Sequence, residues 1–152
     1  METKGGEGPQ PKVGVASDGR PMHYSVGAVI EDEQGRLLLM DRRFEPYGFA
    51  SMAGHVDEGE DPLTALMREG LEELHTPLRD VVFIREEEVL WNRCWRADVH
   101  YWWLYQATVD SASVRIDPHE AKGWGWIERE ELPKVPLEPV WAHWLKLTGY
   151  LK

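Results

Sequence analysis

Apolar runs of two different periods alternate along the chain and predict strands interspersed with helices. Runs at 24–30 and 37–40, joined by the turn-like 32–35, predict two strands with a short connection. A further apolar and small-residue run at 49–54 leads through an acidic loop at 55–60 into a helix. The later part of the chain predicts strands at 81–91, 98–109 and 123–127 and a helix from about Glu138.

The helix after the acidic loop has clear signals at both ends. Asp61 is a favourable N-cap residue, Pro62 suits the first helical position, and Pro77 ends the helix. Spacing of the larger apolar residues and one glycine predicts a single buried stripe. Its members are Leu63, Met67, Gly70, Leu71 and Leu74.

These elements predict one α/β domain of the α+β type, a mixed β-sheet sandwiched between helices. The chain has 152 residues, of which 42% are hydrophobic, so one core is expected. Residues 1–12 are rich in Gly, Pro and charge and are expected to form a flexible N-terminal tail. Residues 13–152 then form the single domain.

Charge and composition narrow the classes of partner. The formal net charge of −10 argues against a long nucleic acid as ligand, but not against a small anionic substrate whose charge a metal ion screens. The single cysteine, Cys94, cannot form an internal disulfide, and no signal-peptide pattern is visible, so a cytoplasmic location is expected. No apolar stretch approaches the roughly 20 residues that span a bilayer, so no membrane partner is expected.

Three glutamates of the helix after the acidic loop suggest a metal site. Glu69, Glu72 and Glu73 are three or four residues apart and crowd one face, where like charges repel. A solvated helix face is the alternative explanation. A hard divalent cation, Mg²⁺ or alternatively Mn²⁺, would turn the repulsion into binding and would offset the charge of a phosphate group.

The same residues carry a resemblance to the Nudix hydrolase family. Residues 54–76 read GHVDEGE, then DPLTALM, then REGLEELHT, which is similar to the Nudix box at its first glycine and at all its charged positions. Three positions depart from the family pattern, namely Gly70, His75 and Thr76. We expect Gly70 to permit close packing and His75 to mark an adapted helix end, with a histidine ligand as the alternative for His75.

The resemblance implies a Nudix-like fold and a role for each box residue. Glu69, Glu72 and Glu73 would hold Mg²⁺ together with the carbonyl of Ala53, and Arg68 would orient Glu69 by a charge-assisted hydrogen bond. Glu60 would lie outside the ligands of the metal or bind it occasionally. A calcium loop built from Asp57, Glu58, Glu60 and Asp61 is a weaker alternative, because the spacing does not match an EF-hand.

The resemblance also points to the loop before the 123–127 strand, where family members often place a glutamate that binds the metal or acts as general base. Glu120 is the candidate, and the neighbouring His119 is an alternative base. The alternative without a catalytic role is that Glu120 is an ordinary exposed glutamate of a loop.

Substrate contacts are expected outside the box. Trp91 and Trp95 are candidates for stacking on a base, although most of the tryptophans must belong to the core. Arg42 and Arg43, at the end of a strand, are candidate phosphate contacts, with ordinary surface arginines as the alternative.

The expected function is Mg²⁺-dependent hydrolysis of a diphosphate (pyrophosphate) bond in a small-molecule, nucleotide-like substrate. The alternatives are a non-nucleotide diphosphate substrate and a Nudix-like module that binds a ligand without turnover. The sequence leaves the individual substrate open and is compatible with a homodimer.

Overall fold

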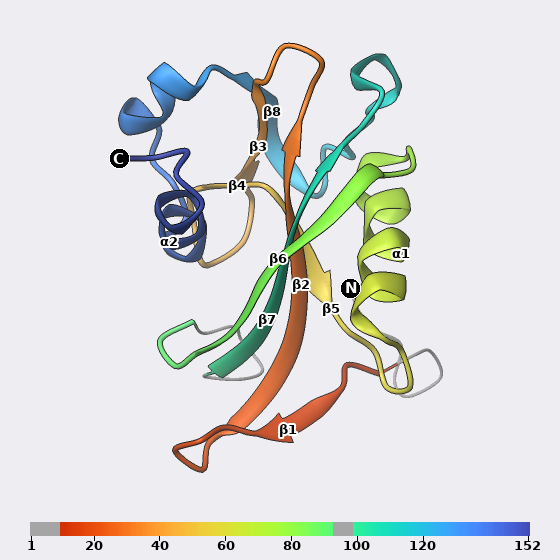
Figure 1. Ribbon diagram of the computed structural model, residues 1–152, viewed down its shortest axis with the longest axis vertical. Helices are drawn as coiled ribbons and strands as arrows, with labels where there is room; N and C mark the ends of the chain where they lie inside the picture. Colours follow the sequence, from red (N-terminus) through yellow and green to blue (C-terminus); the bar gives the residue numbers. More distant parts are fainter. Residues whose placement is uncertain (1–9, 93–98) are drawn as a thin grey trace.

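Figure 1 shows a computed structural model of the protein, in which a strongly twisted sheet lies between two helices. The structure describes residues 10–92 and 99–152. The helices are α1 (Pro62–Leu74) and α2 (Pro139–Leu147), and short 3-10 turns cover Ser111–Ser113 and Arg129–Lys134. The strands are β1 (Val13–Val15), β2 (Pro21–Glu31), β3 (Leu37–Arg42), β4 (Phe49–Ala50), β5 (Met52–His55), β6 (Arg79–Val89), β7 (Val99–Thr108) and β8 (Ala121–Ile127).

The long strand β2 organises the sheet. The main strand order is β4-β3-β2-β7-β6, with β2 and β7 parallel and the other neighbours antiparallel. β1 and β5 also pair with β2, and β8 pairs with β3. The predicted mixed sheet between helices is therefore confirmed, whereas the strand order was not predictable from the sequence.

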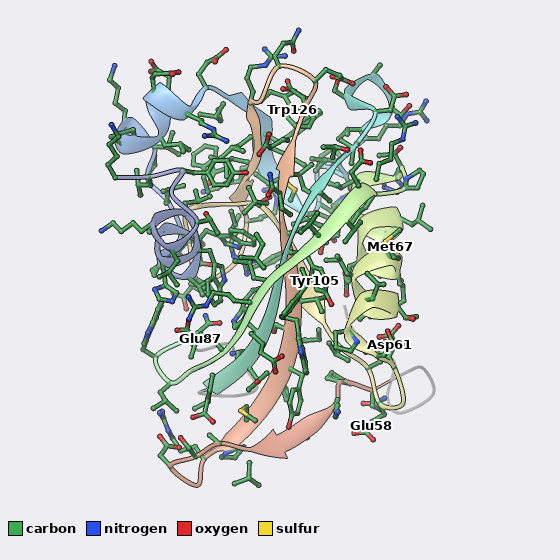
Figure 2. All side chains as sticks on the ribbon, in the orientation of Figure 1. Glu58, Asp61, Met67, Glu87, Tyr105 and Trp126 are labelled. Carbon is green, nitrogen blue, oxygen red and sulfur yellow. The ribbon has the colours of Figure 1, made fainter. Side chains whose placement is uncertain are left out.

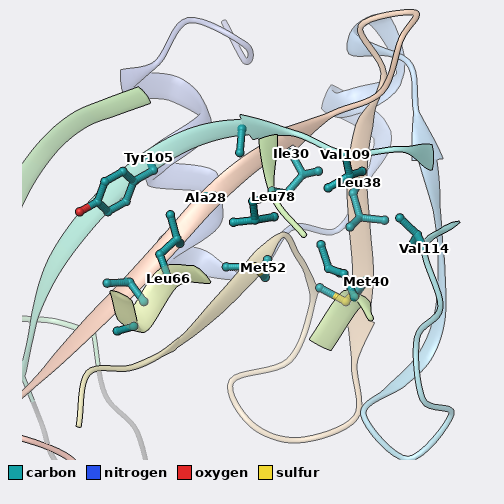
Figure 3. Packing of buried hydrophobic residues seen from close by; sticks show 14 of the residues in the cluster. Ala28, Ile30, Leu38, Met40, Met52, Leu66, Leu78, Tyr105, Val109 and Val114 are labelled. Carbon is teal, nitrogen blue, oxygen red and sulfur yellow. The ribbon is translucent and has the colours of Figure 1, made fainter. Parts of the chain in front are cut away.

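Alternation along β2 divides the core into two layers. Val26, Ala28 and Ile30 belong to the cluster on the α1 side of the sheet, shown in Figure 3, and Val29 belongs to the cluster on the α2 side. The α2-side cluster also holds Trp102, which β7 contributes. Each helix thus covers one apolar face of the same sheet.

The ends of α1 follow the predicted signals. The Asp61 carboxylate accepts a hydrogen bond of 2.8 Å from the backbone N–H of Thr64, and Pro62 occupies the first turn. Figure 2 shows Asp61 at the start of this helix, close to the loop that carries Glu58. At the other end His75 has φ 60°, and its N–H donates to the carbonyl of Leu71. The histidine therefore adopts the left-handed cap that glycine usually provides, as the adapted helix end predicted.

The predicted stripe on α1 was partly wrong. Leu63 and Leu71 are 49% and 52% exposed, and the buried residues are instead Ala65, Leu66, Gly70 and Leu74. The helix is rotated so that Glu69 and Glu73, which flank the Leu66–Gly70–Leu74 row, turn towards the protein rather than towards water. Gly70 permits close packing as expected, because a Cβ there would lie 2.8 Å from Cγ of Leu78.

The N-terminal segment joins the fold before the strand β1. Residues 10–12 were expected in the tail, but the Lys12 N–H donates to the carbonyl of Val56 and the carbonyl of Gln10 accepts from the N–H of Glu58. These residues therefore brace the acidic loop of the Nudix-like segment. Across residues 10–92 and 99–152, neither helix has the length and apolar character needed to cross a membrane.

Candidate active site

Arg68 links α1 to the acidic loop. Its guanidinium makes a two-pronged contact with Glu60, at 2.7 Å to Oε2 and 3.0 Å to Oε1, and donates to the carbonyl of His55 at 3.0 Å. It also donates to Glu69 at 3.1 Å and to Glu72 at 3.2 Å. The predicted contact with Glu69 is present, but the strongest partner is Glu60. Their mutual hydrogen bonds lower the pKa of Glu60 and raise that of Arg68.

Glu69 lies against the backbone of β5. A Cβ at Gly54 would lie only 2.0 Å from Cδ of Glu69, so the absence of a side chain at the first box residue makes room for this carboxylate. Burial raises the pKa of Glu69 to about 7, and the neighbouring charge of Glu72 adds to the effect while Arg68 opposes it. The carboxylate is held in a position where its own negative charge is costly.

Glu73 lies one helical turn further along and is more deeply placed. Burial raises its pKa well above the ordinary value, and the charges of Glu69 and Glu120 raise it further. The N–H of Ala53 donates to this carboxylate and partly offsets the effect. Two neighbouring buried carboxylates, both reluctant to ionise, are the arrangement that a divalent cation would stabilise.

The open edge of β5 explains why Ala53 faces the glutamates. The N–H of Val56 donates to the carbonyl of Tyr24, so Val56 is hydrogen-bonded to β2, and alternate residues of β5 point their polar groups away from that strand. Ala53 and His55 occupy the outward positions. The contacts of the Ala53 N–H with Glu73 and of the His55 carbonyl with Arg68 agree with this geometry, which also turns the carbonyl of Ala53 outward.

Glu72 and Glu120, the other two glutamates predicted for the site, lie at its solvent-exposed margin. The side chain of Glu72 is 58% exposed and is tied only to Arg68 among the hydrogen bonds and ion pairs of the described residues. Glu120 is exposed but lies on a small cavity of about 80 Å³ that Glu73, Arg42 and Ala53 also line. The structure therefore brings Glu120 to the same recess as Glu73. His119 is turned towards Asp117 and is 94% exposed at its side chain.

A larger cavity of about 440 Å³ adjoins this recess on the α2 side. Arg42 and Ala53 line both spaces, so the carboxylate recess and the larger cavity share a wall. The lining combines flat rings with polar groups, which suits an organic ligand bearing a charged end. Its members are Ser25, Arg42, Phe44, Glu45, Pro46, Ala53, Gly54, His55, Asn92, His100, Trp102, Glu138, Val140 and Trp141.

Of the two candidate arginines, only Arg42 lines the cavities. Arg42 lines both cavities, and in the described chain its hydrogen bonds go to the carbonyls of Pro46 and Glu45 rather than to a carboxylate. Its positive charge is thus available to an anion. Arg43 lines neither cavity and instead donates to the carbonyl of Pro118, so the expected phosphate contact at Arg43 is not supported.

The tryptophans of the cavity are not the predicted ones. Trp91 is 51% exposed, packs edge-on against the ring of His143 and does not line the cavity, and Trp95 lies outside the described residues. Trp102 and Trp141 supply the lining rings instead. Both belong to the α2-side core and are only 5% and 1% exposed, so they form the cavity wall with small parts of their surfaces.

Sequence reasoning missed three cavity residues that the fold brings together. Glu138 is buried at the start of α2, where it accepts a 2.6 Å hydrogen bond from the N–H of Val140, and burial raises its pKa. His55 and His100 come from β5 and β7, the two strands that pair with β2 on either side. Period-two alternation along β7 places His100 and Trp102 on one face, but no local pattern indicates which face lines a cavity.

Comparison with known proteins identifies the family. The NUDIX domain family matches residues 21–147. The RNA pyrophosphohydrolase of Novosphingobium aromaticivorans is 29% identical over 135 residues, covering 77% of this chain and 84% of that protein. The RNA pyrophosphohydrolase of Cereibacter sphaeroides (strain ATCC 17029 / ATH 2.4.9) is 30% identical over 128 residues, covering 74% and 79%.

Solved structures agree with this match. A MutT NUDIX hydrolase from Burkholderia pseudomallei has a TM-score of 0.71 and 25% identity, covering 82% of this chain and 96% of that chain. A C. elegans Ap4A hydrolase binary complex has a TM-score of 0.53 and 25% identity, covering 73% and 84%. Together with the box on α1 and the mixed sheet between two helices, these similarities show that the chain belongs to the Nudix hydrolase family.

Proposed function

We propose that this Nudix hydrolase cleaves a diphosphate bond of a nucleotide-like small molecule with the aid of Mg²⁺. The observation that carries the proposal is the pair of neighbouring, largely buried carboxylates of Glu69 and Glu73, whose pKa values are both raised, at the recess that Glu73 lines. Such oxygen donors fit a hard divalent cation, and its charge would remove the reason for the raised pKa values.

The proposed ligand set follows from this placement. Glu69 and Glu73 would bind the ion from the helix, the outward carbonyl of Ala53 would bind it from β5, and Glu72 would reach it from the exposed side. The hydrogen bonds with Glu60 would fix the Arg68 guanidinium, and the guanidinium would in turn hold the carboxylate of Glu69 in place. When bound, Mg²⁺ would neutralise charge on phosphate oxygens and make a bound water more acidic.

The remaining residues would position the substrate. Arg42 would bind a phosphate where the two cavities meet, because this residue lines both. The rings of Trp102 and Trp141 would contact the organic part of the substrate in the larger cavity. Glu120, which lines the recess but not the larger cavity, would take a proton from the attacking water.

The choice between a small nucleotide and an RNA end rests on charge. The curated relatives are RNA pyrophosphohydrolases, which makes an RNA 5′ end the principal alternative substrate. The formal net charge of −10 opposes binding along a nucleic acid backbone. We therefore propose that recognition is confined to the terminal nucleotide and its phosphates.

A substrate panel tests this proposal. The full-length protein, freed of any purification tag, is incubated with Mg²⁺ and dinucleoside polyphosphates, ADP-ribose, nucleoside triphosphates, a diphosphate that lacks a base, or a 5′-triphosphorylated RNA oligonucleotide. Products separated by ion-exchange chromatography identify the bond that is cleaved. Glu73→Gln provides the matched control, because it keeps the side-chain size and removes one ligand charge.

The expected result is Mg²⁺-dependent cleavage of at least one small nucleotide, abolished by chelator and by Glu73→Gln. Cleavage of the RNA oligonucleotide but of no small nucleotide would overturn the substrate class. Saturable binding of a nucleotide with no product from any compound would favour the binding-module alternative over an enzyme.

A further inference from the structure

Three histidines gather on the α2-facing side of the sheet, apart from the glutamates of α1. His23, His55 and His100 come from β2, β5 and β7, which lie side by side in the lower half of Figure 1. His23 is the direct partner of His100 in the parallel pair, and His55 is the direct partner of Ser25, two residues from His23. The register therefore places all three side chains on one face at neighbouring positions.

Their ring nitrogens are close enough to share an ion. One nitrogen from each ring lies within 4.8 Å of the other two, and Nε2 of His55 is 3.5 Å from Nε2 of His100. Zn²⁺ bound by imidazole nitrogens at about 2.0–2.1 Å in a tetrahedral site separates those nitrogens by about 3.4 Å. One pair already has this spacing, and a small rotation of His23 would complete it.

The orientation of His100 is fixed by groups around it. Its Nδ1 lies 2.6 Å from the backbone carbonyl of Asn92, which can only accept a hydrogen bond, so Nδ1 carries the proton and Nε2 presents its lone pair. The Asn92 side chain is held in turn, because its Oδ1 accepts from Nε1 of Trp102 at 2.7 Å. A carbonyl behind the distal nitrogen is the usual support of a metal-binding histidine.

The location of the cluster gives such an ion access to the larger cavity. His55 and His100 both line the cavity of about 440 Å³, whereas His23 does not, and both His23 (7% exposed) and His100 (3% exposed) are buried. Three imidazoles complete three positions of a tetrahedral zinc ion and leave the fourth for water or a ligand. Because His55 and His100 line the same cavity as Arg42, the fourth position would open into that space.

We propose that His23, His55 and His100 form a second metal site that binds a borderline transition metal of the Zn²⁺ type, with its open position facing the cavity. Imidazole donors favour Zn²⁺, Co²⁺ or Ni²⁺ over Mg²⁺, whereas the carboxylates of α1 favour the harder ion. The two sites therefore select different metals on either side of β5. This site does not depend on the proposed hydrolysis, because binding of the metal alone defines it.

Zinc binding in excess Mg²⁺ tests the proposal, since Mg²⁺ then occupies the carboxylates. The full-length, tag-free protein is titrated with Zn²⁺ by calorimetry, and Co²⁺ serves as a spectroscopic substitute. The single variants His55→Gln and His100→Gln remove cavity-facing donors, and His119→Gln removes a histidine that lies in an exposed loop. Far-ultraviolet circular dichroism checks that each variant is folded, and the half-exposed His55 is the position least coupled to folding.

We expect one Zn²⁺ per chain, an intense visible spectrum typical of tetrahedral Co²⁺, and a change in that spectrum when inorganic phosphate is added. Affinity should fall at least about 100-fold in His55→Gln and His100→Gln, but not in His119→Gln or Glu73→Gln. Zinc binding that survives His55→Gln and is lost in Glu73→Gln would overturn the proposal, as would the weak spectrum of octahedral Co²⁺. A tetrahedral spectrum that phosphate leaves unchanged would contradict the open position.

Discussion

Replacing Gly54 by alanine should remove activity while leaving the fold intact. The new Cβ would lie 2.0 Å from Cδ of Glu69, whereas ordinary contacts begin at 3.4 Å, so the carboxylate must retreat by about 1.4 Å. Metal ligands tolerate errors of only about 0.2 Å. A displacement of about 1 Å at a reacting centre costs about 100-fold in rate, or about 3 kcal/mol of transition-state stabilisation.

Stability should change little in the same variant. Gly54 is not among the glycines with positive φ, so alanine fits the backbone, and the atoms in the way belong to the end of a flexible side chain. A compatible Gly→Ala exchange stabilises a protein by about 0.4–1 kcal/mol through the unfolded state, which offsets part of the disturbance around Glu69. The midpoint of thermal unfolding should therefore stay within a few degrees of the wild-type value.

The assay compares the turnover number and the affinity for Mn²⁺, measured by electron paramagnetic resonance, in Gly54→Ala and in Gly125→Ala. Gly125 is a matched control because it also lies in a strand and a Cβ there would meet no atom within 4 Å. A Gly54→Ala protein with wild-type turnover and Mn²⁺ affinity would refute the placement of Glu69 at the metal. Equal losses in both variants would show that the effect is not specific to this contact.

Three further outcomes follow from the site. Without divalent metal, the pKa of Glu69 is about 7 in the folded protein and 4.5 in the unfolded chain. Between pH 4.5 and about 7 the folded state therefore keeps a proton that the unfolded chain has lost. The contribution of Glu69 to stability, measured by urea unfolding as the difference between the wild-type protein and Glu69→Gln, should thus be fully present below pH 4.5 and fall by up to about 3 kcal/mol as pH rises through 7. Mg²⁺ should suppress the fall, and a difference that does not change with pH in the absence of metal would contradict it. Glu120→Gln should lower the turnover number at least about 100-fold with little change in KM if Glu120 is the general base, and unchanged pH–rate profiles would remove that role. Trp102→Ala should cost about 3–5 kcal/mol of stability in thermal unfolding. Trp91 is an exposed ring outside the cavity, so Trp91→Ala should change neither the thermal midpoint nor KM. A raised KM for Trp91→Ala would show that this ring contacts the substrate.

Local chemistry made the helix α1 predictable from the sequence. Asp61, Pro62 and the spacing of the box residues fixed where the helix begins and which side chains it presents, because capping and helical periodicity depend only on neighbours along the chain. The direction of the buried face was less certain. Leu63 and Leu71 were expected inside, but the contacts of Glu69 with β5 and of Gly70 with Leu78 rotate the helix away from them.

Non-local pairing accounts for what the sequence did not reveal. The parallel ladder that joins Met22 to Val99 brings together segments that are far apart along the chain, and no local pattern specifies its register. That register places His23 beside His100 and turns Trp102 into the cavity wall. Arg43 was a reasonable candidate from its position after a strand, but its direction depends on the loop at Pro118, which a one-dimensional pattern cannot locate.

The most direct measurement of the central claim is the Mg²⁺ dependence of turnover in the wild-type protein and in Glu73→Gln, combined with thermal unfolding of both in the absence of metal. We predict that the variant loses at least about 100-fold in turnover number at low Mg²⁺. Its metal-free thermal midpoint should be equal to or higher than that of the wild-type protein, because glutamine replaces a carboxyl group whose ionisation is unfavourable at this position. Near wild-type turnover of Glu73→Gln at low Mg²⁺ would contradict the assignment of the metal to the glutamates of α1.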